Sequence, residues 1–168
     1  MIAQKSELEE SLRLARDCIT GGYLDSALEW LDTTYFRSVN AGVEIPYAQI
    51  TAILESARSN GLDVEAGYRR LAEKELRRAE GNARFGFLDN VIGNINRARK
   101  YGAGAGVELP EEKIKLLFGT TYKNRIGAQV RNAGHGVNIS ATTLAGVEEL
   151  AYQEGVRAAD DYIKGLPK

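Results

Sequence analysis

The side chains with the clearest binding chemistry lie in a stretch of the chain that has no carboxylate. Residues 113–147 carry five lysines or arginines and no aspartate or glutamate, although 27% of all residues are charged. Arginine and asparagine offer several hydrogen-bond donors to a carboxylate or a phosphate, and a tyrosine ring offers a flat surface to a base or a peptide side chain. The candidate residues for binding a partner or an anion are Tyr122, Lys123, Asn124, Arg125, Arg131 and His135.

Two interpretations fit this stretch. On a helix, Tyr122, Arg125 and Gln129 would share one stripe, with Asn124 and Arg131 nearby, and this face could receive an anion. Alternatively, the basic side chains could pair with residues 1–66, which hold 11 acidic and 5 basic side chains, in the same molecule or in another copy. The basic side chains in question are Lys113, Lys115, Lys123, Arg125 and Arg131.

Conventional catalytic and metal-binding chemistry lacks its residues in this sequence. Cys18 and His135 are the only members of their kinds, so a zinc site has too few ligands, and no nucleophile motif surrounds a serine. Gly102, Gly104 and Gly106 form a Gly-x-Gly-x-Gly run between two expected helices. A phosphate-binding loop of this type follows a strand, so we expect a connector there. The sequence predicts a protein that is not an enzyme and holds no metal or cofactor.

The elements that must position these residues are expected to be helices. Apolar residues recur at helical spacing along most of the chain, and the alternation typical of strands is absent. We predict an all-α fold of about seven helices, in which Gly119 and Gly127 leave the length of the sixth open. The expected helices cover residues 8–19, 24–35, 46–59, 63–79, 88–98, 110–133 and 140–165.

One short connector recurs between these helices. A glycine, an apolar residue, an acidic residue or asparagine, and a branched apolar residue follow one another at 42–45, 61–64, 106–109 and 136–139. Glycine readily adopts the left-handed conformation after a helix, and the apolar residue behind it can fold back onto the last turn. We therefore predict positive φ at Gly42 and Gly106.

The chain also repeats itself at a distance of 64 residues. Leu12 matches Leu76, Gly22 matches Gly86, and the segment 41–44 matches 105–108. At the same offset Tyr23 aligns with Phe87, and we take this aligned pair as a packing position in each unit. We predict a single helical-repeat domain over 1–168, with a three-helix unit at 6–62, a second at 63–138 and a capping helix at 139–165.

The first two helices of each unit resemble tetratricopeptide repeats. Leucine, alanine and glycine residues fall at the spacings of that family's helical hairpin over 12–34 and 76–98. Arrays of that family repeat about every 34 residues, whereas this chain repeats at 64 with a third helix in between. The resemblance implies paired antiparallel helices and a role in binding a partner.

Composition and architecture together favour a non-enzymatic module or scaffold for protein–protein interaction. The alternative is binding of nucleic acid or an anionic ligand through the basic 113–135 helix, and complementary acidic and basic segments could also support self-association. No run of about 18 apolar residues is present, so we expect no membrane partner. One cysteine and no export signal predict a cytoplasmic location.

Overall fold

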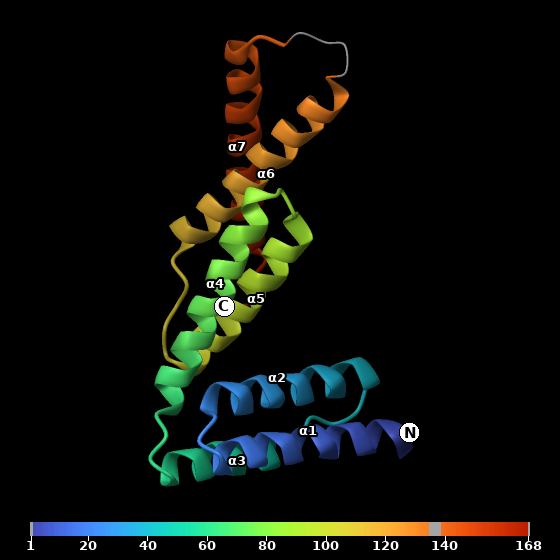
Figure 1. Cartoon of the computed structure of the whole chain (residues 1–168), viewed down its shortest axis with the longest axis vertical. Helices are drawn as coiled ribbons and strands as arrows, with labels where there is room; N and C mark the ends of the chain where they lie inside the picture. The colour runs from blue at the N-terminus through green and yellow to red at the C-terminus, as the bar shows by residue number, and fades with distance from the viewer. Residues whose placement is uncertain (1, 135–138, 168) are drawn as a thin grey trace. The chain divides into compact units, whose positions relative to one another are not determined.

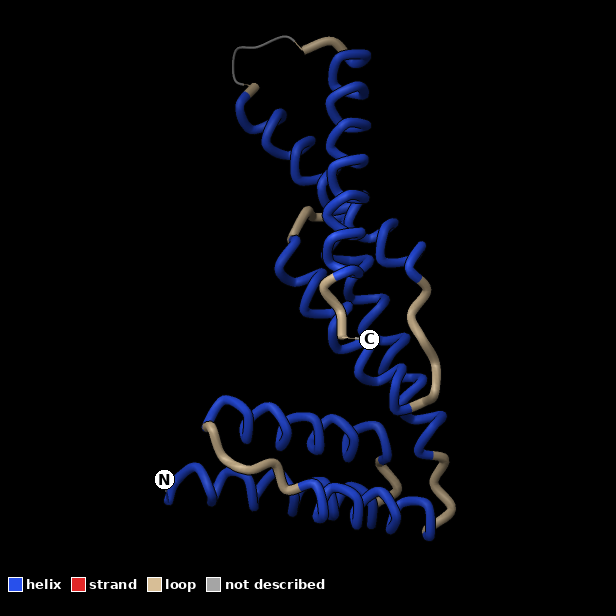
Figure 2. Tube along the Cα trace, turned by 180° about the vertical axis from the view of Figure 1, so that it is seen from behind, coloured by secondary structure: helices blue, strands red, loops and turns tan. Residues whose placement is uncertain are grey.

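The computed structural model describes residues 2–134 and 139–167, and within these ranges the chain forms seven α-helices and no strand (Figure 1). The predicted all-α class is confirmed. Figure 2 shows short loops between successive helices from α1 to α6. The helices are α1 (Ile2–Thr20), α2 (Leu24–Ala41), α3 (Tyr47–Ser59), α4 (Val64–Arg84), α5 (Leu88–Gly104), α6 (Glu111–Ala133) and α7 (Ala141–Lys164).

The predicted helix ends are confirmed at the three connectors that the structure describes in full. Gly42, Gly61 and Gly106 have φ values of 62°, 78° and 66°. The apolar residue that follows each glycine folds back as expected, since the amide of Val43 donates to the Ser38 carbonyl at 3.0 Å. The fourth connector includes residues 136–138, which lie outside the described residues.

Replacing Gly42 or Gly106 with alanine should lower the free energy of unfolding by about 1 kcal/mol each, because a Cβ is strained at positive φ. Neither site has an atom within 4 Å of the new Cβ, so the strain is the whole effect. Gly81 is the control, because it lies inside α4 with equally open space and gains helix propensity as alanine. Urea unfolding measures all three variants, and equal stability of Gly42→Ala and Gly81→Ala would contradict the assignment of strain.

The structure divides into two compact units. The first comprises the residues up to Leu71 together with Gly104–Gly106, and the second comprises Ala72–Ala103 and the residues from Val107 onward. The boundary lies inside α4, whereas the repeat places it before that helix. Each unit has its own set of buried apolar side chains.

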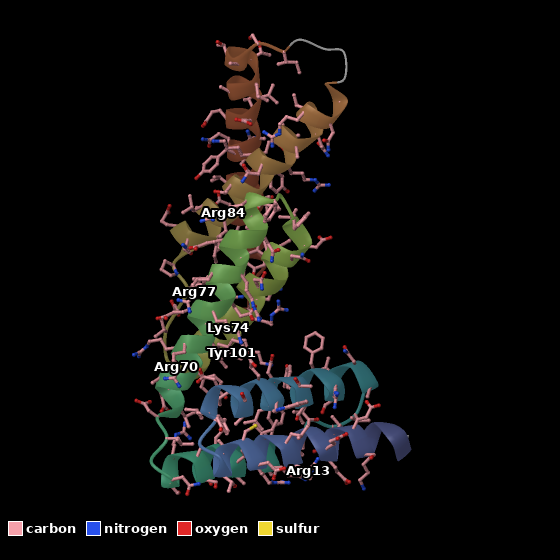
Figure 3. The ribbon with its side chains drawn as sticks, viewed as in Figure 1. Arg13, Arg70, Lys74, Arg77, Arg84 and Tyr101 are labelled. Atoms are coloured by element: carbon pink, nitrogen blue, oxygen red, sulfur yellow. The ribbon has the colours of Figure 1, made fainter. Side chains whose placement is uncertain are left out.

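In the first unit, α1 packs against α2 and α3. The α1 side chains on the predicted apolar face, Leu12, Ala15 and Ile19, are buried. An ion pair ties the start of α4 to α2, because the guanidinium of Arg70 donates to Asp25 at 2.6 Å (Figure 3). Both side chains are about half exposed, so this pair contributes little to stability.

In the second unit, the end of α4 packs with α5, α6 and α7 around one apolar cluster. Its buried members are Ala79, Ala83, Val91, Ile95, Ile114, Leu117, Phe118 and Ala159. The C-terminal helix is part of this cluster, since the rings of Phe118 and Tyr162 lie 5.5 Å apart. The sixth helix is continuous through Gly119 and Gly127, which resolves the length that the sequence left open.

Two pairs of helices start at the 64-residue offset, but one expected packing position is wrong. Helices α2 and α5 begin at Leu24 and Leu88, and α3 and α6 begin at Tyr47 and Glu111. However, Tyr23 and Phe87 are exposed. Each aromatic residue directly follows a glycine with positive φ, and this turn directs its side chain outward rather than into a core.

Candidate binding groove between α6 and α7

Helices α6 and α7 touch where both present glycine. A Cβ added to Gly155 would lie 2.5 Å from the Phe118 carbonyl oxygen, and one added to Gly119 would lie 2.6 Å from the Tyr152 ring. Small residues thus allow the two backbones to approach closely. Beyond this crossing the two helices diverge toward the segment that joins them (Figures 1 and 2).

The diverging halves of the two helices enclose a groove of about 470 Å³. Its lining is more apolar than polar, and it is open to solvent: Leu150 is 67% exposed. The lining residues are Tyr122, Arg125, Ile126 and Gln129 from α6, and Val147, Leu150, Ala151 and Glu154 from α7.

The structure brings some of the predicted site residues together and separates others. Tyr122 and Arg125 line the groove with Gln129, as their helical spacing predicted. Asn124 instead points to the end of α4, where its side-chain amide donates to the Ala83 carbonyl at 3.0 Å. That bond satisfies a carbonyl at a helix C-terminus, so the role of Asn124 is structural.

Three other members of the predicted site lie elsewhere. Lys123 and Arg131 are exposed and do not line the groove. His135 lies outside the described residues.

The five basic residues of this stretch fall into two groups, those that form ion pairs and those that do not. Lys113 pairs with Glu80, and Lys115 pairs with Asp160 at 3.3 Å. The hydrogen bond and the negative charge of Asp160 raise the pKa of Lys115. Both acids lie outside residues 1–66, so within the described chain these two lysines pair inside their own unit, and pairing with residues 1–66 of another copy stays a prediction.

Lys123, Arg125 and Arg131 differ from those two lysines. The side chains of all three are exposed, and within 2–134 and 139–167 none of them forms an ion pair. A cation that is not already paired can form a salt bridge with an incoming carboxylate or phosphate. Of the three, Arg125 is the one that also borders the groove.

Sequence reasoning missed an exposed aromatic pair next to this surface. Phe85 and Phe87 are 70% and 53% exposed, and their rings stack with centroids 5.9 Å apart. Gly86 between them packs against the backbone of Arg125, and Arg84 ends α4 directly before the turn (Figure 3). The signal was the Phe-Gly-Phe sequence itself, since two aromatics around a turn glycine cannot both belong to a helix face.

A buried carboxylate on α4 is already fully engaged. Glu75 accepts hydrogen bonds from Arg78 at 2.7 Å, Asn94 at 2.7 Å and Arg97 at 3.0 Å. Burial raises the pKa of Glu75, but the hydrogen bonds from Asn94 and Arg97 and the charge of Arg97 outweigh burial and hold it below its ordinary value. An ionised, fully paired carboxylate suits a structural role better than proton transfer.

The described residues offer neither a metal site nor a membrane-spanning helix. Among the described residues, no group of three or more His, Cys, Asp or Glu side chains is placed to hold a metal ion. Over the same residues, none of the helices combines the length and the apolar character needed to cross a bilayer.

Comparison with known proteins adds no relative: no protein-family model, no curated protein and no solved structure matches this chain. The resemblance to tetratricopeptide repeats therefore stays a prediction from the residues that carry it.

Proposed function

We propose that this protein is a non-enzymatic module that binds a protein partner in the cytoplasm through the groove between α6 and α7. The observation that carries the proposal is the exposure of Leu150 within a concave, apolar surface. Large apolar side chains in a hollow with polar rims are typical of places where a partner inserts an anchor residue. The groove volume suits a few side chains of such a partner.

Two charged residues of the groove can set the direction in which a partner segment binds. The guanidinium of Arg125 is exposed without an ion pair in the described part of the chain, and Glu154 lines the groove from the other helix, α7. A partner that places an acid near Arg125 and a base near Glu154 gains two favourable contacts, and the reversed partner meets two like charges. Charges arranged in this way select the direction in which a segment binds.

A second candidate function is binding of nucleic acid or another anion through the basic helix. Lys123 and Arg125 are available for phosphates, and the exposed Phe85–Phe87 pair offers ring faces on which bases could stack. A formal net charge of −1 gives little long-range attraction for a polyanion, which favours the protein partner.

Leu150→Asp tests the proposed function, because it places a charge in the apolar lining of the groove. The purified protein is immobilised, and proteins captured from the cytoplasm of the source organism are compared with and without nuclease treatment. We expect a partner that the wild type captures in both conditions and that Leu150→Asp loses at least about tenfold. Leu116→Asp is the control, since Leu116 is an exposed leucine of α6 outside the groove.

Two outcomes would count against the protein partner. If Leu150→Asp captures the same proteins as Leu116→Asp, the groove is not the binding surface. If the captured material disappears on nuclease treatment, the second candidate function is favoured.

A further inference from the structure

The α7 helix, which lines the groove, shares several residues with α4, and in α4 the shared Glu75 is bound by side chains of α5. At an offset of 79 residues, seven α4 residues recur in α7 with the same identity, and four of them carry the comparison. Leu71, Glu75, Arg78 and Ala79 correspond to Leu150, Glu154, Arg157 and Ala158. In both helices the glutamate pairs with the arginine three residues later, at 2.7 Å in α4 and 3.8 Å in α7.

The surroundings of the two glutamates differ sharply. The Glu75 side chain is 5% exposed, because Asn94 and Arg97 of α5 bind its carboxylate. The Glu154 side chain is 64% exposed, and among the described residues no asparagine or arginine of a neighbouring helix binds it. Leu71 is buried, whereas its counterpart Leu150 is exposed. The α7 face thus has the residues of a helix-packing surface without the helix.

The uncovered part of this face has a definite length. Toward the C-terminus α7 is covered, since Ala159 is buried in the apolar cluster and the Tyr162 hydroxyl donates to Asn96 of α5. The open part runs from Val147 to Glu154 along the groove. At 1.5 Å per residue this is about 10 Å, or two helical turns.

We propose that the groove binds one amphipathic helix of a partner protein, and that this helix has the surface chemistry of α5. Its apolar stripe contacts Leu150, Val147 and Ile126, and an asparagine and an arginine three residues apart reach the carboxylate of Glu154. The model for these contacts is the way Asn94 and Arg97 bind Glu75 within this same chain. This inference rests on the proposed function and names the kind of partner segment that the groove accepts.

The direct probe is a peptide of residues 86–103, which contains α5 up to Ala103, labelled with fluorescein at its N-terminus. Fluorescence anisotropy follows its binding to the full-length chain, and circular dichroism follows its helicity. We expect saturable binding accompanied by a gain of helix, with affinity reduced about tenfold or more by Leu150→Asp and unchanged by Leu116→Asp. Equal affinity for both variants would overturn the inference.

A charge exchange tests the contact with Glu154 itself. Glu154→Arg in the protein, or Arg97→Glu in the peptide, should each weaken binding about tenfold, and the two changes together should restore it. Glu149→Arg is the control, because it reverses the same charge on α7 outside the groove. Absence of restoration, or an equal effect of Glu149→Arg, would show that the charges act nonspecifically and would overturn the assigned contact.

The two proposals fail differently. A peptide that does not bind, combined with loss of the captured protein in Leu150→Asp, overturns the α5-like helix and keeps the groove as the partner site. A peptide that does not bind, combined with capture that Leu150→Asp leaves intact, overturns both.

Discussion

Replacing Glu75 with alanine is expected to lower the free energy of unfolding of the second unit by about 2–4 kcal/mol. The change removes the acceptor of three hydrogen bonds and leaves the Nδ2 group of Asn94 buried without its acceptor, while the Asn94 Oδ1 still accepts from Asn82. Unsatisfied buried groups and broken charged networks are among the largest single-residue effects on stability. Arg78 and Arg97 are about half exposed and can turn to water, which keeps the loss below that of a fully buried network.

The control is Glu73→Ala, which removes an exposed glutamate from the same helix and should change stability by no more than about 0.5 kcal/mol. Urea unfolding followed by circular dichroism compares the variants with the wild type. If Glu73→Ala and Glu75→Ala were equally stable, the Glu75 network would contribute nothing.

The Glu75 effect should also depend on pH. Because the folded-state pKa of Glu75 is lower than its value in the unfolded chain, its contribution is fully present above about pH 4.3 and is lost as the pH falls through the folded-state pKa. The difference between wild type and Glu75→Ala should therefore narrow below about pH 4.

Gly86→Ala should destabilise the protein by about 3 kcal/mol, and Gly22→Ala by about 1 kcal/mol. The two glycines are equivalent at the 64-residue offset and have similar φ values, 73° and 79°. Only at Gly86 would the new Cβ also collide with backbone, 2.8 Å from the Cα of Arg125. The strain at positive φ is thus common to both variants, and overpacking against α6 is added in one.

Chemical unfolding with two signals measures this pair. Trp30, the only tryptophan, belongs to the first unit and reports its unfolding by fluorescence, whereas circular dichroism reports all helices. Gly86→Ala should shift the circular dichroism transition more than the tryptophan transition. Equal losses of stability in the two variants would show that α6 moves aside without cost.

The order of helices could be predicted because each carries its signal locally. Buried Leu12, Ala15 and Ile19 lie on the apolar face that their spacing indicated, and Asp63 caps α4 through a hydrogen bond from the Ala66 amide. A glycine at a helix end is likewise a local sequence signal, because it marks where the helix stops. Such features depend on neighbours within one or two turns, so a single sequence contains them.

The groove could be predicted only in part, because it depends on contacts between distant segments. The stripe of Tyr122, Arg125 and Gln129 follows from helix geometry, but the exposure of Leu150 does not. Gly119 appeared to threaten the continuity of α6, and its actual role is to admit the Tyr152 ring of α7. Likewise, Asn124 has the chemistry of a binding residue and is used to satisfy the end of α4.

The placement of the glycine crossing has a consequence for motion. The buried residues of α6 and α7 lie between Ile114 and Gly127 and between Ala151 and Ala159, so the stretches 128–134 and 141–150, which contribute Gln129, Val147 and Leu150 to the groove, hold no buried residue. Segments with few buried contacts open locally at a lower free energy than the core. A bound helix would slow that opening. We therefore expect binding of a partner to slow amide hydrogen exchange in residues 128–134 and 141–150. The outer part of the groove is therefore also the part of this unit whose order a partner can change most.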